Sequence, residues 1–257
     1  RSLMELKEAH VFCFSPANHT MQVCQHIIEK IEYPGVMHNL TAHGSYSNVS
    51  LSSDDLAIFA VPSFGGRVPA VALEKFKELN GNQTPCLLVV TFGNRAQEDT
   101  LIELKDFVEQ QGFITVGAMA VVCEHSIMHQ FGANRPDAED FKKMDAYLAN
   151  LQSSLQQKKA LQVQVPGNHP YKEFHAIPMV PKANSSCIAC GKCAIECPVE
   201  AIDPMSPSTT DKNKCISCMR CITICPTHAR ALNPIILKGA VLKLKKACET
   251  RKEIELY

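Results

Sequence analysis

The chain has 257 residues, enough for one large domain or two modest ones. Hydrophobic residues make up 46% and charged residues 20%, so we expect a packed core rather than a disordered chain. The 26 basic and 26 acidic residues balance, which argues against a protein devoted to binding nucleic acid. No run of about 18 apolar residues is present, so no membrane span is expected.

The first half of the chain alternates short apolar runs with amphipathic segments. Strands are expected over 9–14, 36–40, 56–61, 86–91 and 113–122. Helical spacing of apolar residues follows at 23–31, 73–79 and 101–108, and a long amphipathic helix is expected over 137–159. Fully apolar strands that alternate with helices predict an α/β fold with a parallel sheet covered on both faces.

Loops that follow the strands of such a sheet are the expected ligand sites. In loop 15–20, hydroxyl groups at Ser15 and Thr20 flank the start of a helix, where backbone N–H groups can bind a phosphate, although helix caps have the same composition. Loops 62–69 and 91–99 place Phe64 and Phe92 beside glycines. Glycine lets a flat ring approach the backbone and an aromatic side chain can stack on it, but ordinary turns are the alternative.

A boundary is expected near residue 180. Residues 1–181 carry 14 basic and 19 acidic residues, whereas residues 182–257 carry 12 and 7. Prolines make 166–181 a poor helix and a semi-rigid linker. We therefore expect a first domain over 1–165, a linker over 166–181, a small domain over 182–232 and a C-terminal helix or tail over 233–257.

The small domain contains a cysteine repeat. Eight of the 13 cysteines lie between Cys187 and Cys225, in two copies of C-x2-C-x2-C-x3-C-P that are 28 residues apart. This doubled spacing is typical of two [4Fe–4S] clusters in which the fourth cysteine of each copy serves the other cluster. Zinc sites usually pair two C-x2-C knuckles, and disulfide scaffolds are usually short secreted chains. We therefore expect metal-ligating thiolates in a reducing compartment, the cytoplasm.

The cysteine repeat and the three loops together resemble a family that fuses a flavodoxin-like domain to a bacterial two-cluster ferredoxin, sometimes called ferrodoxins. The resemblance implies a doubly wound, parallel five-stranded sheet of order 2-1-3-4-5 and a small α+β ferredoxin-like domain. It implies that one cluster is bound by Cys187, Cys190, Cys193 and Cys225, and the other by Cys197, Cys215, Cys218 and Cys221. The implied FMN site contains Ser15, Ala17, Asn18, His19, Thr20, Pro62, Phe64, Gly65, Gly66, Arg67, Phe92, Gly93, Asn94, Arg95 and Gln97.

These features predict an electron-transfer protein that passes electrons between FMN and two [4Fe–4S] clusters and serves a redox partner protein. The family's phosphate loop reads S/T-x-T-G-x-T, whereas this chain has Ala17 and Asn18 at two of those positions. The alternative is therefore a ferredoxin whose flavodoxin-like domain has lost the flavin and serves as a docking scaffold. An FMN- and ferredoxin-dependent oxidoreductase and an iron–sulfur sensor are weaker alternatives. A homodimer and a compact monomer both remain open.

Overall fold

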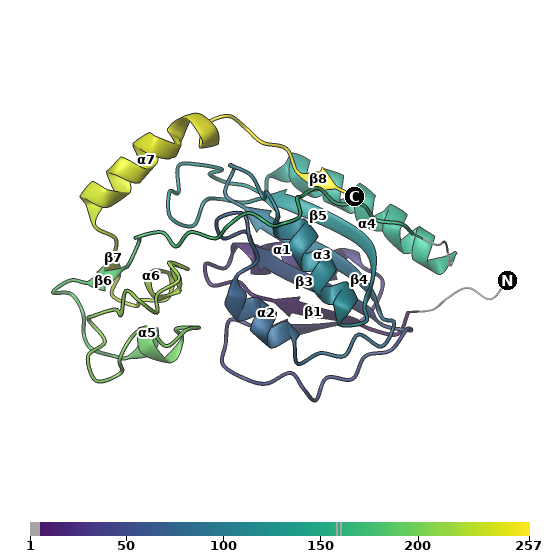
Figure 1. Ribbon diagram of the computed structural model, residues 1–257, viewed down its shortest axis with the longest axis horizontal. Coiled ribbons are helices and arrows are strands. Elements are labelled where there is room, and N and C mark those ends of the chain that lie inside the picture. Colours follow the sequence, from purple (N-terminus) through teal and green to yellow (C-terminus); the bar gives the residue numbers. More distant parts are fainter. Residues whose placement is uncertain (1–5, 158, 160) are drawn as a thin grey trace.

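The computed structural model describes residues 6–157, 159 and 161–257 (Figure 1). Its larger part is a six-stranded sheet in the order β2-β1-β3-β4-β5-β8. The strands are β1 (Ala9–Cys13), β2 (Gly35–Asn39), β3 (Leu56–Pro62), β4 (Pro85–Phe92), β5 (Ile114–Val122) and β8 (Glu255–Leu256).

Strands β1 to β5 pair in parallel, as the alternation of strand and helix predicts. Every residue of β1 and β4 is buried, because a parallel sheet is covered on both faces. The order 2-1-3-4-5 is the flavodoxin-like order, and the sequence prediction of this fold is confirmed. The strand order reverses between the neighbouring strands β1 and β3, so the loops that follow them lead in opposite directions. Sheets of this kind bind ligands at that point.

A sixth strand, β8, extends the sheet and was not predicted. It pairs antiparallel with β5 through Ala120 and Met119. The Tyr147 hydroxyl donates a hydrogen bond of 2.6 Å to the carbonyl oxygen of Tyr257, which fixes the end of the strand. A two-residue strand carries almost no pattern in the sequence, and it forms only because the edge of β5 is available.

Helices α1 (His19–Lys30), α2 (Ala70–Phe76), α3 (Thr100–Gln110) and α4 (Ala138–Gln156) cover the sheet. The strand order reverses direction after β2, so right-handed crossovers place α1 on one face and α2 and α3 on the other. Phe76 of α2 lies near Phe107 of α3, with ring centroids 6.5 Å apart. His26 of α1 packs on Phe141 of α4 at 4.3 Å, so α4 shares the face of α1.

Helix α4 lies within the range 137–159 over which a long amphipathic helix was expected, and Lys158 lies outside the described residues. Its N-cap is Asp137, whose side chain accepts hydrogen bonds from the backbone of Glu139 and Asp140. Beyond α4, the described residues up to 181 form no helix or strand. Linker residues instead hydrogen-bond to the first domain, as in the contacts of Asn168 and Lys172 with Asp99.

The cysteine module, residues 182–232, lies beside the sheet (Figure 1). It holds a two-stranded antiparallel sheet of β6 (Lys182–Ala183) and β7 (Arg230–Ala231) and two short helices, α5 (Lys192–Ile195) and α6 (Arg220–Thr223). Helix α7 (Pro234–Cys248) then leads back towards β8. In the described part of the chain, no helix is both long and apolar enough to cross a membrane.

Candidate functional site

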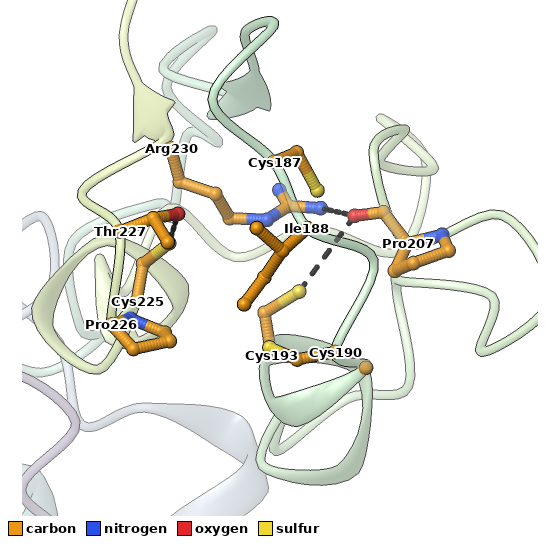
Figure 2. A pocket seen from close by; sticks show the side chains of 10 residues that line it. Cys187, Ile188, Cys190, Cys193, Pro207, Cys225, Pro226, Thr227 and Arg230 are labelled. Atoms are coloured by element: carbon orange, nitrogen blue, oxygen red, sulfur yellow. Dashed lines mark hydrogen bonds between the residues drawn. The ribbon is translucent and has the colours of Figure 1, made fainter.

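Four cysteines of the module surround one small cavity. Cys187, Cys190 and Cys193 reach it from the first copy of the repeat, and Cys225 reaches it from the second copy (Figure 2). These four residues are called the first cysteine set below. The cavity therefore joins a fourth cysteine to the three cysteines of the other copy.

The remaining four cysteines, Cys197, Cys215, Cys218 and Cys221, are called the second cysteine set. Cys197 is buried in a small apolar cluster on which Cys215 and Cys221 pack. Cys218 lies close enough to the other three that their charges influence its pKa. The structure thus brings together both sets that the resemblance implied, each with its fourth member from the opposite copy.

The backbone repeats in the two copies as the sequence does. Left-handed φ angles occur at Gly191 and Met219, which precede α5 and α6, and again at the equivalent pair Glu200 and His228. These turns aim backbone N–H groups at sulfur. The N–H group of Ala201 donates to Cys197 Sγ at 3.3 Å, and that of Ala229 donates to Cys225 Sγ at the same distance.

Burial makes the second cysteine set a poor place for bare thiolates. It raises the pKa of Cys218 to about 12 and that of Cys221 to about 11. A cationic metal group is what stabilises deprotonated sulfur in such surroundings. No group of three or more His, Cys, Asp or Glu side chains is arranged for a single metal ion within the residues that the structure describes. A cubane cluster takes each cysteine on a separate iron, so the two sets fit [4Fe–4S] clusters.

The cysteine module contacts the first domain at the carboxyl ends of β1 and β2. Arg220, between Cys218 and Cys221, donates to the backbone oxygen of Pro16 at 3.4 Å and to Asn18 Oδ1 at 3.2 Å. His43 Nε2 lies 3.0 Å from the carbonyl oxygen of Cys197.

A shared apolar core supports this contact. Its members come from the loop after β5, the linker, the cysteine module and α7, namely Ile127, Met128, Phe131, Met179, Met219 and Cys248. The cysteine module is therefore packed against the edge of the sheet formed by the carboxyl ends of its parallel strands, here called the rim.

Loop 15–20 has the shape of a helix start, and its hydroxyl groups contact other protein atoms. Ser15 Oγ accepts a hydrogen bond from the Met21 N–H group at 2.9 Å and so satisfies one backbone donor in the first turn of α1. Thr20 Oγ1 lies 2.8 Å from Thr91 Oγ1. Asn18 adopts a left-handed conformation before α1, and Ala17 and His19 are half-buried. Both hydroxyl groups predicted to bind phosphate thus bind protein atoms.

The two loops expected to flank a flavin ring, 62–69 and 91–99, also make contacts with other residues of the chain. Phe92 is the last residue of β4 and is buried, whereas Phe64 is half-buried and packs edge-on against Phe14 at 6.3 Å. Arg67 pairs with Glu103 at 2.7 Å. Pro62 ends β3. The remaining polar residues also have protein partners: Asn94 binds Cys248 and Thr250, Arg95 binds Glu98, and Gln97 caps α3 at Leu101.

Side chains from elsewhere in the chain lie next to the glycines of loops 62–69 and 91–99. A Cβ atom at Gly65 would lie 3.7 Å from the Phe174 ring of the linker. One at Gly93 would lie 2.6 Å from His125 Cδ2. Gly66 faces Glu98 in the same way. The close approach that glycine allows, predicted for a flat ligand, is made here by residues of this chain.

An open pocket of about 450 Å³ lies next to loop 91–99, between the linker and β8. Its lining includes Gln97, Glu98, Asn168 and Tyr257. Of the two loops expected to flank a flavin ring, loop 91–99 lines this pocket with its later residues, and loop 62–69 contributes none of the lining residues.

Comparison with known proteins assigns the cysteine module. Residues 186–229 match the family described as the 4Fe–4S dicluster domain. The cysteine module is a 4Fe–4S dicluster domain. Together with the strand order 2-1-3-4-5, this makes the chain a fusion of a flavodoxin-like domain and a dicluster domain.

Solved structures resemble the chain only distantly, and no curated protein sequence matches it. A rubredoxin:oxygen oxidoreductase from Desulfovibrio gigas is 13% identical with a TM-score of 0.44, and the match covers 60% of this chain but only 38% of that one. A flavodoxin from Streptococcus pneumoniae is 15% identical with a TM-score of 0.40, covering 57% of this chain and 98% of that one. The flavodoxin of Megasphaera elsdenii is 16% identical with a TM-score of 0.38, and the shares are 56% and 98%. The fold assignment rests on the strand order and not on these similarities.

Sequence reasoning missed the residues that dock and surround the dicluster domain. Arg220 and Arg230 belong to the repeat, where they are equivalent to Lys192 and Ile202. The change from Ile202 to Arg230 is visible in the sequence, because it sets a charge opposite an apolar residue. His43 gave no such signal, since its contact with the domain depends wholly on the tertiary fold.

Proposed function

We propose that the chain is an electron-transfer protein that binds two [4Fe–4S] clusters, one on each cysteine set. The observation that carries this proposal is the cavity in which Cys225 joins Cys187, Cys190 and Cys193 from the other copy of the repeat. Such crossing is what the doubled C-x2-C-x2-C-x3-C-P spacing requires. It is not expected of two independent zinc knuckles.

Bound clusters would supply one-electron transfer, and the protein supplies ligands, burial and hydrogen bonds. Backbone N–H groups of Ala201 and Ala229 stabilise sulfur charge on one cysteine of each set. The second set lies at the docking contact with the flavodoxin-like domain, through Arg220 and Cys197. The first set is more open, because Cys190 is exposed and Ile188 is 65% exposed. We assign the first set to exchange with an external redox partner protein.

The flavodoxin-like domain acts in this proposal as the docking scaffold of the dicluster domain. The reducing cytoplasm is the proposed location, because the eight cysteines that would bind clusters have to stay reduced. Electron transfer between the two domains does not require a homodimer, since the dicluster domain reaches the rim within one chain. Sedimentation at low and high salt tests the oligomeric state.

FMN at the rim is a second candidate. One observation favours it: Arg220 Nε is buried without a hydrogen-bond partner in the described part of the chain, beside the start of α1. A phosphate could bind between this guanidinium group and the helix N-terminus. The ring end fits poorly, because Glu98 and His125 crowd Gly66 and Gly93, two of the glycines that would admit it. We therefore assign no step to a flavin.

Anaerobic purification followed by iron, acid-labile sulfide and flavin analysis tests both candidates. The first predicts about eight irons and eight sulfides per chain without flavin. Stoichiometric zinc, or about four irons, would overturn the two-cluster proposal. Stoichiometric FMN beside a full complement of iron would establish the second candidate and require loops 62–69 and 91–99 to rearrange.

A further inference from the structure

The two copies of the cysteine repeat differ at one buried position. Five residues after the fourth cysteine of each copy stand Ile202 and Arg230, and each residue is only 3% exposed. Ile202 lies in an apolar cluster with Cys197, Ala194 and Ala201, as the core of a small domain requires. Its equivalent carries a full positive charge at the same depth.

The Arg230 guanidinium group lies between the two cysteine sets. It lines the cavity of the first set and extends towards Pro207 (Figure 2). Its Nη1 atom lies 3.9 Å from Cys221 Sγ of the second set. The same charge therefore faces both candidate clusters.

Neutral oxygens hold this charge in place. Nη1 donates to Thr210 Oγ1 at 2.8 Å and to the Pro181 carbonyl, and Nη2 donates to the carbonyls of Pro207 and Thr209. Nε is buried without a partner among the described residues, and none of the ion pairs found there includes Arg230. A buried cation usually needs an anion nearby. The anionic charge that faces Arg230 is that of the cysteine sulfurs and of whatever they bind.

We propose that Arg230 is an electrostatic tuning residue that raises the reduction potentials of both clusters. Reduction adds one negative charge to a cluster, and a fixed cation a few ångströms away in a buried site stabilises that added charge. Ile202 provides no such charge at the equivalent position, so the effect comes from one copy of the repeat. This inference rests on the proposed function, because it requires clusters on both cysteine sets.

The test is an anaerobic redox titration followed by electron paramagnetic resonance on the full chain and three variants. Arg230→Gln keeps hydrogen-bonding capacity without the charge, Arg230→Ile copies the equivalent residue, and Arg230→Lys keeps the charge with fewer donors. Iron is counted in each variant first. A wild-type chain that lacks two clusters would contradict the proposed function and not Arg230 specifically.

With iron retained, the ratio of reduced to oxidised cluster at a fixed potential should be at least tenfold lower in the Gln and Ile variants than in the wild type. This corresponds to a reduction potential about 59 mV lower for a one-electron couple. The Lys variant should remain near the wild type. Equal potentials in wild type and the Gln variant would overturn the tuning role. Loss of iron from all three variants would do so as well, because Arg230 would then serve to hold the fold of the domain.

Discussion

The Arg220 guanidinium group lies 3.2 Å from Asn18 Oδ1, although the two residues are 202 positions apart in the sequence. The same side chain forms an ion pair with Glu196, next to Cys197. One arginine thus links the loop after β1 to both copies of the cysteine repeat. It ties the placement of the second cysteine set to the rim of the flavodoxin-like sheet.

Replacing Arg220 with Ala should loosen this docking without unfolding either domain. Hydrogen bonds that involve a charged group contribute roughly 1.5–3 kcal/mol, so amide exchange over residues 16–22 should accelerate by about tenfold or more. Exchange within β4 should not change. Hydrogen–deuterium exchange measures both regions in one experiment. Arg220→Lys is the control that keeps the charge, and equal protection of 16–22 in all three proteins would contradict the docking role.

The crossed cysteine sets predict which cluster each substitution damages. Cys197→Ser should lower the iron content from about eight to about four per chain by disrupting the cluster of Cys215, Cys218 and Cys221. Cys225→Ser should disrupt the other cluster. Electron paramagnetic resonance of the reduced variants distinguishes the two, because a different signal should remain in each. If each serine instead removed the cluster of its own repeat copy, the assignment of the sets would be wrong.

The sequence was sufficient for the parallel sheet because its strands β1, β3, β4 and β5 are almost wholly buried and read as continuous apolar runs. The two cysteine sets could also be predicted from the sequence, since their spacing is local. The contacts at the rim of the sheet could not be predicted. Whether Gly65 faces a flavin or Phe174 depends on where a linker about 110 residues later returns to the sheet, and no local pattern encodes that contact.

Two long-range contacts account for most of the difference at the rim. The loop after β5 folds back so that His125 covers Gly93, and the C-terminal segment reaches Asn94 after α7. Both arrive from outside the strand–helix alternation on which the prediction was built. Their side chains occupy positions that the pattern alone leaves for a ligand.

His125 should make the stability of the protein depend on pH. Burial first, and then the charges of His129, Arg95 and His19, lower the pKa of His125 to about 4. The neutral ring accepts hydrogen bonds from the N–H groups of Ile127 and Met128 at Nδ1. Because the unfolded chain binds a proton near pH 6.5, this contribution is complete above that pH and is lost as the pH falls towards 4.

The matched variant is His125→Asn, whose side-chain oxygen can accept the same turn hydrogen bonds without titrating. Between pH 7 and pH 5 the wild type should lose about 2 kcal/mol of unfolding free energy more than the variant does. Urea denaturation at several pH values, followed by circular dichroism, measures this difference. If the unfolding free energies of the two proteins changed in parallel with pH, His125 would not be the source of the pH dependence.

The ion pair of Arg135 and Asp140 should be the most costly one to break. Their side chains are 5% and 0% exposed, and Arg135 Nη2 donates to Asp140 Oδ1 at 2.7 Å. Arg135 also donates to the carbonyl oxygen of Lys252, so the pair ties the start of α4 to the segment before β8. Arg135→Met would leave the buried Asp140 carboxylate with only the Asp137 N–H group and the more distant Arg251, 3.6 Å away, and should destabilise the protein by about 3 kcal/mol. Lys77→Met, which breaks an exposed pair with Glu74, is the control and should cost less than about 1 kcal/mol. Urea denaturation compares the two, and similar losses would mean that burial does not set the strength of the Arg135 pair.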